Sequence, residues 1–341
     1  MAAISIDPPA PSNGSRAWTR DSLAATGDGF FYDIKPETQD EIAEALRRIH
    51  GRGLDLSTVE AEDFRLPSLA IDIPGLRRRL DDGPGFVVVR GLIDDGLSRD
   101  EADIVYWGMA NYLGRVIRQN LTGVRLDTVS DKGAGRWDPY RLVDTNDRFD
   151  THTDNAFLEC RAPDYLGLCC YRQAREGGAS LLLNAYTIHD EIAAAHPEWL
   201  ARLHKDFHHD LPSNQRLPDG PSTKAWPVFE ERDGDLVMHF LRIYIDPGME
   251  TAGSPLSADE RAMLDFIDDL TQRKDLLFQY RMAPGEALFN NNRWLLHGRL
   301  PFADDADPEK GRLLARTWMW RRHLPPGDDP VALDAAEFGI E

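Results

Sequence analysis

Cysteine, lysine and long apolar runs are all scarce in this chain of 341 residues. The three cysteines, Cys160, Cys169 and Cys170, are an odd number and lack the spacing of zinc ligands. They therefore indicate neither a disulfide framework nor a zinc site, and we expect a cytoplasmic protein. No apolar run approaches the roughly 20 residues that span a membrane. The first residues lack a basic stretch followed by an apolar one, so we expect no secretory signal.

An excess of positive charge is also missing. The formal net charge is -19, from 39 basic and 58 acidic residues. A surface this acidic repels the phosphates of nucleic acids and of anionic membranes. We therefore expect neither nucleic acid nor a membrane as partner. The oligomeric state does not follow from these patterns.

Apolar periodicity predicts a mainly β protein with flanking helices. A capped helix is expected at 36–53, with Thr38 as N-cap and Glu41 completing a capping box. Further helices are expected at 73–85, 98–114, 185–206 and 256–271. Strands are expected at 86–92, 164–172, 177–184, 235–246, 286–299 and 312–322. Strands and helices do not alternate throughout, which favours a β-sandwich or barrel buttressed by helices over a doubly wound sheet.

The chain divides into one large domain and two short ends. Residues 1–15 are rich in Pro, Ser and Ala and are expected to be disordered. Residues 16–330 form the single domain, and 331–341 form a C-terminal tail. Segments 115–150 and 208–234 are polar and aperiodic, which is typical of lids over a binding site. The candidate substrate-binding residues are Gln119, Asn120 and Trp137 from the first segment, Arg242 from the expected strand 235–246, and Arg316.

The stretch "DTHTDN", residues 150–155, is the candidate metal motif. In an extended strand His152 and Asp154 lie on the same face and can reach one ion. His297, in "NNNRWLLHGR", would complete a set of two histidines and one carboxylate, which leaves one face of an octahedral ion open. An H-x-D pattern is common by chance, and a histidine after "WLL" is more often part of a core than a ligand.

Two arginines follow in the strand "RLLARTWMWRR". Arg312 and Arg316 share a strand face with Trp318 and Trp320, because side chains alternate along a strand. A guanidinium that faces the interior needs an anion, and its planar fork matches a carboxylate. The two Cα atoms are roughly 13 Å apart in an extended strand, so the arginines are expected to serve different ends of a site.

The order of these motifs, H-x-D, "EGGASLLL", "NNNRWLLHGR" and "RLLAR-W", resembles the iron(II)- and 2-oxoglutarate-dependent oxygenases. The branch it is most similar to is the taurine dioxygenase and clavaminate synthase-like group. The resemblance spans about residues 16–327. It implies a double-stranded β-helix, a jelly-roll barrel with outer helices. It also implies that His152, Asp154 and His297 are catalytic residues that bind Fe(II).

The resemblance assigns the remaining roles as well. Arg312 and Ser180 would hold the distal carboxylate of the cosubstrate 2-oxoglutarate, and Arg316 would lie nearer the substrate or the proximal carboxylate. The implied reaction uses O2 to hydroxylate an unactivated C–H bond of a small polar substrate, such as an amino acid or a natural-product intermediate. It releases succinate and CO2. The presence of Asp154 disfavours halogenation, whereas desaturation or epoxidation on the same scaffold stays open.

Two other interpretations of the chain are a zinc enzyme and a non-catalytic metal-binding protein. A zinc enzyme would use His204 and His208, four residues apart, but Lys205 stands where the H-E-x-x-H motif has glutamate. We interpret these histidines as a solvated helix end. A non-catalytic jelly-roll protein that only binds a metal would not need both Arg312 and Ser180.

Overall fold

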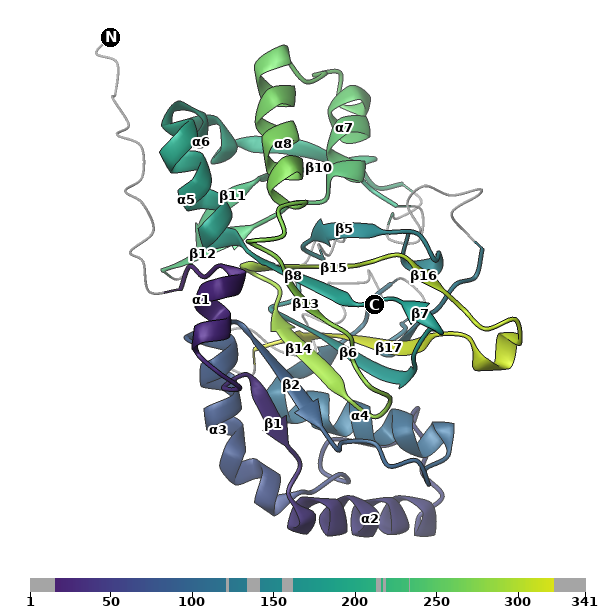
Figure 1. The fold of residues 1–341 in the computed structure, drawn as a ribbon. Helices are drawn as coiled ribbons and strands as arrows, with labels where there is room; N and C mark the ends of the chain where they lie inside the picture. Colours follow the sequence, from purple (N-terminus) through teal and green to yellow (C-terminus); the bar gives the residue numbers. More distant parts are fainter. Residues whose placement is uncertain are drawn as a thin grey trace, which may run out of the picture.

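Two sheets form the frame of the molecule (Figure 1). The computed structural model describes residues 16–120, 123–133, 142–154, 162–212, 216, 219–232 and 234–321. The larger sheet has seven strands, in the order β1 (Phe31–Asp33), β2 (Phe86–Arg90), β14 (Ala287–Asn291), β6 (Tyr165–Arg172), β17 (Leu313–Trp320) and β3 (Arg115–Ile117), with β4 (Asp127–Val129) also on β17. The smaller sheet has the order β13 (Phe278–Tyr280), β8 (Ser180–Asn184), β15 (Leu295–Arg299) and β5 (Phe149–His152).

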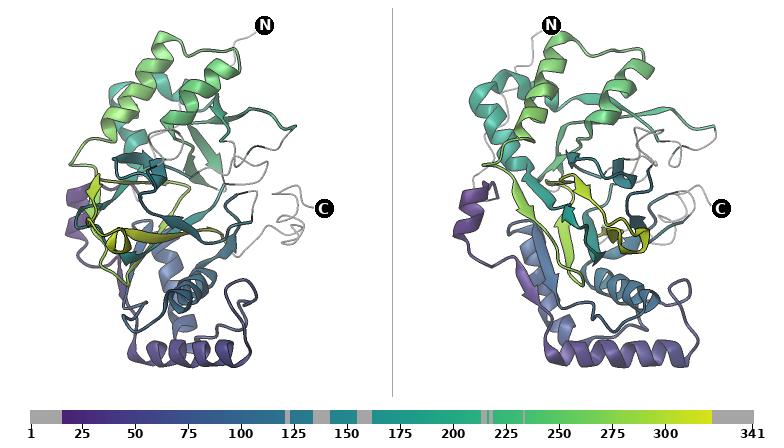
Figure 2. Two further views of the ribbon diagram at one scale, coloured as in Figure 1. Left: turned by 90° about the vertical axis from the view of Figure 1, so that its right-hand side faces the viewer. Right: turned by 45° about the vertical axis from the view of Figure 1, so that its right-hand side comes forward.

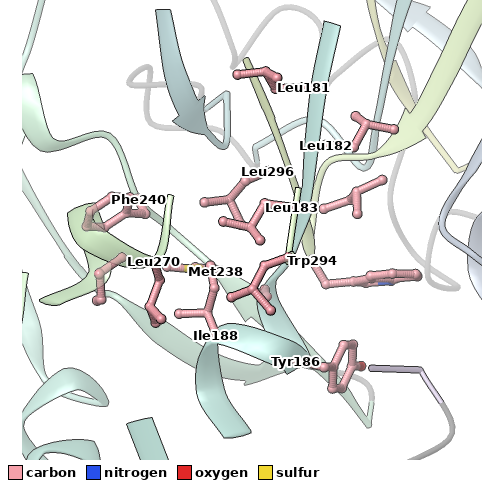
Figure 3. Close-up of a cluster of buried hydrophobic side chains, with 14 of the residues drawn as sticks. Leu181, Leu182, Leu183, Tyr186, Ile188, Met238, Phe240, Leu270, Trp294 and Leu296 are labelled. Carbon is pink, nitrogen blue, oxygen red and sulfur yellow. The ribbon is translucent and has the colours of Figure 1, made fainter. Parts of the chain in front are cut away.

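Alternating apolar side chains bury both faces of the larger sheet. Phe86 and Val88 on β2 join an apolar cluster that also includes Leu183 and Leu296 from the smaller sheet. Figure 3 shows part of this cluster, where β8 and β15 meet α5 (Ala185–Ala195). Val87, one position along β2, belongs to a second cluster beneath the helices. The period of two therefore places one core between the sheets and another outside the larger sheet.

Helices cover the assembly at two ends (Figure 2). The second cluster is closed by α2 (Pro36–Gly51), α3 (Pro67–Asp81) and α4 (Arg99–Leu113), of which α3 and α4 contact the larger sheet directly. The other end carries α5, α6 (Pro197–Leu203), α7 (Arg242–Thr251) and α8 (Ala258–Leu270), and α1 (Arg20–Ala25) lies near the beginning of the chain. None of the helices in the described part of the chain has the length and apolar character needed to cross a membrane.

The predicted cap of α2 was wrong. The helix begins at Pro36 after Lys35, and Thr38 is buried inside its first turn. Proline suits the first helical position because its missing N–H would have no partner there. Capping boxes are found instead where α1, α4 and α8 begin, formed by Thr19 with Ser22, Ser98 with Glu101, and Ser257 with Glu260.

Two of the predicted strands were also divided differently. Residues 235–246 form β12 (Asp235–Met238) and the start of α7, so Arg242 lies on a helix and not on a strand face. Its guanidinium pairs with Asp246 one turn later, and with Asp265 and Asp268 of α8. Residues 286–299 form β14 and β15, which belong to different sheets.

The two segments expected to be aperiodic contain paired strands. In 115–150, β3 and β4 both pair with β17. In 208–234, β9 (Asp206–Asp210) pairs with β10 (Thr223–Pro227), and β11 (Phe229–Arg232) pairs with β12. A small pair, β7 (Glu176–Gly177) and β16 (Phe302–Ala303), lies beside the smaller sheet. These strands are short, and a short strand shows too little alternation of apolar and polar residues to be recognised in the sequence. Their role as lids stays a prediction.

The described cysteines behave as structural residues. Cys169 and Cys170 are buried free thiols that join the clusters on opposite faces of β6. Burial raises the pKa of Cys170 to about 11, so this thiol stays protonated at neutral pH. Cys160 and the two terminal segments, 1–15 and 331–341, lie outside the described residues.

A glycine inside α4 generates the first prediction. A Cβ at Gly108 would lie 2.1 Å from the ring of Phe64, which is fully buried. We expect Gly108→Ala to lower the free energy of unfolding by about 1–3 kcal/mol through overpacking, although alanine favours helices. Urea unfolding measures this change. The matched control is Gly75→Ala inside α3, where the nearest atom is 3.8 Å away. That variant should gain up to about 1 kcal/mol. Equal effects at both sites would contradict the packing argument.

Candidate active site

The pairing of β5 with β15 brings the first two candidate ligands together. His152 lies directly opposite His297 in this antiparallel pair, and their ring centroids are 4.4 Å apart. Asp154 follows two residues after His152. Its Oδ1 lies 3.4 Å from Nε2 of His152 and 3.8 Å from Nε2 of His297. All three side chains are buried, and one ligand atom from each lies within 4.8 Å of the others.

Both imidazoles direct Nε2 toward Asp154. His152 donates its Nδ1–H to the carbonyl oxygen of Asp150 at 2.8 Å, which fixes the orientation of the ring and leaves Nε2 to face Asp154. Phe149 stacks on the same ring at 4.0 Å. Burial, together with the neighbouring His152, lowers the pKa of His297 to about 3. His297 is therefore neutral at physiological pH, which is the form that binds metal ions.

The carboxylate of Asp154 stays ionised although it is buried. Burial alone would raise its pKa, but the charge of Arg316 brings the pKa well below its usual range. Two imidazoles and one carboxylate that converge on one point fit an iron(II) ion and leave its other face open. Within the described ranges, His152, Asp154 and His297 are the one group of histidine, cysteine or acidic side chains close enough together to hold a metal ion.

Two arginines occupy the other end of the cavity beside these histidines. The cavity is lined by His152, His297, Arg299, Arg312, Ser180, Arg316, Val129, Val143, Phe149, Leu168, Gly298 and Leu314. Arg299 lies opposite Ser180 in the pairing of β15 with β8. Arg299 and Arg312 both approach the ring of Phe302, at 4.9 and 5.1 Å from its centroid. Gly178 lies next to Arg312 and has a positive φ, which favours glycine. A Cβ at this position would lie 3.2 Å from Nε of Arg312.

Neither of these two guanidiniums has a carboxylate partner among the described residues. Nε and Nη1 of Arg312 and Nε of Arg299 are buried without a hydrogen bond there, and Arg299 donates only to backbone carbonyls. Burial lowers the pKa of each to about 10, and the charge of Arg299 adds to the effect on Arg312. Both remain charged at neutral pH. An electropositive, partly unsatisfied pocket of this kind is suited to an anion.

Arg316, the third arginine of the cavity, is placed differently. It contacts Asp154 at 3.2 Å and Asp127 at 3.4 Å, and its Nε donates to Gln119 at 2.8 Å. Gln119 therefore braces Arg316, and Asn120 accepts a hydrogen bond from the backbone N–H of Val124 within a turn. A direct contact of either residue, or of Arg316, with substrate stays a prediction.

The other predicted substrate residues are not brought to this cavity. Arg242 is held by three carboxylates of α7 and α8, as described above, and does not line the cavity. Trp137 lies outside the described residues. Arg299 was missed, although it follows His297 by two residues and so shares its strand face. Trp318, noted for its position on β17, donates its Nε1–H to Asp154 at 2.6 Å.

His204 and His208, the ligands that a zinc enzyme would use, lie in different secondary-structure elements. His204 caps the end of α6, whereas His208 lies within β9. They therefore do not share a helix face, as an H-E-x-x-H site requires. His204 is half-buried beside His189 and Phe229, so the interpretation as a solvated helix end was wrong for it.

Comparison with known proteins identifies the family. A profile for "Taurine catabolism dioxygenase TauD, TfdA family" matches residues 51–318. The chain belongs to this family. It is 25% identical over 314 residues to "FR-33289 synthase" of Streptomyces rubellomurinus, covering 91% of this chain and 90% of that protein. It is 27% identical over 329 residues to "Taurine hydroxylase-like protein SAT17" of Stachybotrys chartarum, with 92% and 82% covered.

Solved structures share the fold. An asparagine oxygenase in complex with Fe(II), 2S,3S-3-hydroxyasparagine and succinate has a TM-score of 0.68 at 20% identity, covering 86% of this chain and 94% of that one. The non-heme iron oxygenase OrfP in complex with Fe and alpha-ketoglutaric acid has a TM-score of 0.60 at 17% identity, with 85% and 94% covered. Together, family membership and the His-Asp-His group confirm the predicted enzyme class, an iron(II)- and 2-oxoglutarate-dependent dioxygenase. The non-catalytic alternative does not fit this membership.

The second prediction tests the metal ligands. We expect His297→Ala to lose stoichiometric Fe(II) binding, because two remaining ligands hold a divalent ion far more weakly than three. Anaerobic Fe(II) titration measures the loss, and His208→Ala, outside the cavity, is the matched control. Full iron occupancy in the His297→Ala protein would show that the assignment is wrong.

Proposed function

We propose that this protein hydroxylates an unactivated C–H bond of a small polar substrate. In this reaction one oxygen atom of O2 enters the product. The other enters succinate as 2-oxoglutarate loses CO2. The supporting observation is a single cavity with two chemically different ends. His152 and His297 lie at one end, beside Asp154, and Arg299, Arg312 and Ser180 lie at the other. The two-sheet fold with its outer helices fits the double-stranded β-helix that the motifs implied.

The two ends match the two carboxylates of 2-oxoglutarate. His152, Asp154 and His297 would hold the iron(II) ion, which when bound would supply the activation of dioxygen. Arg312 would grip the distal carboxylate with its unsatisfied N–H groups, Ser180 would donate its hydroxyl, and Arg299 adds a second positive charge. The cavity wall between the ends is apolar, because Val129, Leu168 and Leu314 line it, among others. Such a wall excludes water from the reacting groups and strengthens the charged contacts.

The names of similar proteins support a small polar substrate. The asparagine oxygenase structure contains 2S,3S-3-hydroxyasparagine and succinate, and the OrfP structure contains alpha-ketoglutaric acid. Another structure of OrfP contains (3S)-hydroxy-L-Arg. We therefore infer an amino acid or an amino-acid-like natural-product intermediate as substrate. Hydroxylation is favoured over halogenation because Asp154 fills the third ligand position.

The reaction itself is tested with Fe(II), 2-oxoglutarate, a reductant and dioxygen labelled with heavy oxygen. We expect succinate that carries one heavy oxygen atom, and an amino-acid product that carries one heavy oxygen atom as a hydroxyl group. Mass spectrometry of a panel of free amino acids and their derivatives measures both. A product that lacks two hydrogen atoms and carries no label would indicate desaturation. An absence of succinate in every reaction would contradict the proposal.

The third prediction separates the three arginines. We expect Arg312→Gln to weaken 2-oxoglutarate binding by about 2–5 kcal/mol, or at least roughly 30-fold, because a buried charged partner is lost. Arg299→Gln should weaken it by about 1.5 kcal/mol, roughly tenfold. Calorimetry of the metal-loaded protein without oxygen measures both. Arg175→Gln, an exposed arginine paired with Glu176, is the matched control. A larger loss in Arg316→Gln than in Arg312→Gln would reverse the proposed roles.

A further inference from the structure

The two carboxylate oxygens of Asp154 face different surroundings. Oδ1 lies 3.4 and 3.8 Å from the Nε2 atoms of His152 and His297. Oδ2 accepts a hydrogen bond from Nε1 of Trp318 at 2.6 Å and from Nη1 of Arg316 at 3.2 Å. The oxygen that faces the histidines therefore accepts neither of the two hydrogen bonds from β17, whereas the other oxygen accepts both.

The main chain of Asp154 is held just as closely. Its backbone N–H donates to Oδ1 of Asn292 at 2.9 Å, and Nδ2 of Asn292 donates back to its carbonyl oxygen at 2.7 Å. Asn292 also donates to the carbonyl of Pro163 and is itself buried. Backbone and carboxylate are thus tied at separate points, so the side chain of Asp154 has little freedom to rotate.

The donors to Oδ2 are themselves braced. Gln119 accepts from Nε of Arg316 at 2.8 Å and returns a hydrogen bond to its carbonyl oxygen at 2.8 Å. Asp127 pairs with the other end of the same guanidinium. Trp318 lies two residues along β17, and its ring packs 5.2 Å from the centre of the guanidinium. Both donors therefore come from the same face of one strand.

We infer that Trp318 and Arg316 are positioning residues that hold Asp154 as a one-oxygen metal ligand. If the carboxylate turned to bind an ion through both oxygens, Oδ2 would leave a buried donor, the indole N–H, without its acceptor. Keeping Asp154 to one oxygen preserves three open positions on an octahedral ion, the number that a chelating oxoacid and dioxygen require. The sequence indicated Trp318 only as an apolar neighbour of the arginines.

A purely structural role for Trp318 is the competing explanation, since it packs with Ile117, Leu166 and Trp320 in a small apolar cluster. The test must therefore remove the N–H while keeping the ring. Site-specific replacement of Trp318 by 3-benzothienylalanine does this, because sulfur takes the place of the N–H in a ring of the same shape. The matched control is the same replacement at Trp294. That tryptophan is also fully buried, but its Nε1 has no hydrogen-bond partner among the described residues.

The measurements are anaerobic Fe(II) affinity and the absorption spectrum of the Co(II)-loaded protein, without cosubstrate or substrate. Loss of an outer-shell partner typically weakens metal binding about 10–100-fold. We expect a weakening in this range at position 318, with a changed Co(II) spectrum as the carboxylate turns, and neither change at position 294. A variant at 318 with wild-type affinity and spectrum would overturn the inference, as would equal losses at both positions.

This inference rests on the metal site of the proposed function but not on its substrate or reaction. If the unmodified protein bound no Fe(II), the proposed function would fail. If it bound Fe(II) and the replacement at 318 bound it equally well with the same Co(II) spectrum, only the positioning role would fail. A melting curve of each protein, recorded without metal, shows whether a loss of affinity comes from a damaged fold. A modest fall in melting temperature at 318 is expected, because the hydrogen bond to Asp154 is lost. Loss of cooperative unfolding at 318 alone would assign the loss of affinity to a damaged fold and count against the inference.

Discussion

The charge of Asp154 is the constraint on which the site depends. A carboxylate that leaves water must be paired, and this one is paired by residues from both sheets. β5 and β15 of the smaller sheet bring His152 and His297 to one of its oxygens. β17 of the larger sheet brings Trp318 to the other oxygen. Asn292, in the connection between β14 and β15, holds its backbone. The metal site is therefore also a point where the two sheets are joined by polar contacts.

The two ends of the cavity differ in how their charges are compensated. At the metal end the chain supplies its own counter-charges, because Arg316 contacts both Asp154 and Asp127. At the far end Arg299 and Arg312 lie near one ring with no carboxylate between them in the described part of the chain. The first arrangement keeps three ligand atoms in place before an ion arrives. The second leaves positive charge unsatisfied until an anion binds. Specific recognition of 2-oxoglutarate is therefore expected to come mainly from the arginine end.

Local patterns predicted the residues of the site better than their partners. The alternation of H-x-D and of "RLLARTWMW" was enough to place His152 and Asp154 on one face and to turn Arg316 inward, because the period of a strand is a local property. Arg316 was expected to face a bound molecule, and its partners within the chain, Asp154 and Asp127, were not predicted. Both lie far from Arg316 in sequence, and no local rule pairs such residues. The predicted strand position of Arg242 was wrong for a similar reason. The stretch "HFLRIYI" has the composition of a strand, but Arg242 begins a helix and pairs with Asp265 and Asp268 of α8, which are distant in sequence.

The position of Arg299 could have been predicted from the alternation of side chains along β15, although no motif contains it as a site residue. Arg299 follows His297 by two residues, so the same alternation that turns the histidine into the cavity also turns the arginine into it. Ser180 lies opposite Arg299 on the neighbouring strand. A short stretch of β15 therefore spans the cavity and contributes one residue to each end. Because the rise along a strand is nearly constant, the strand itself sets the separation between His297 and Arg299. A fixed separation of this kind supports the proposed binding of a cosubstrate whose two carboxylates face the histidines and the arginines.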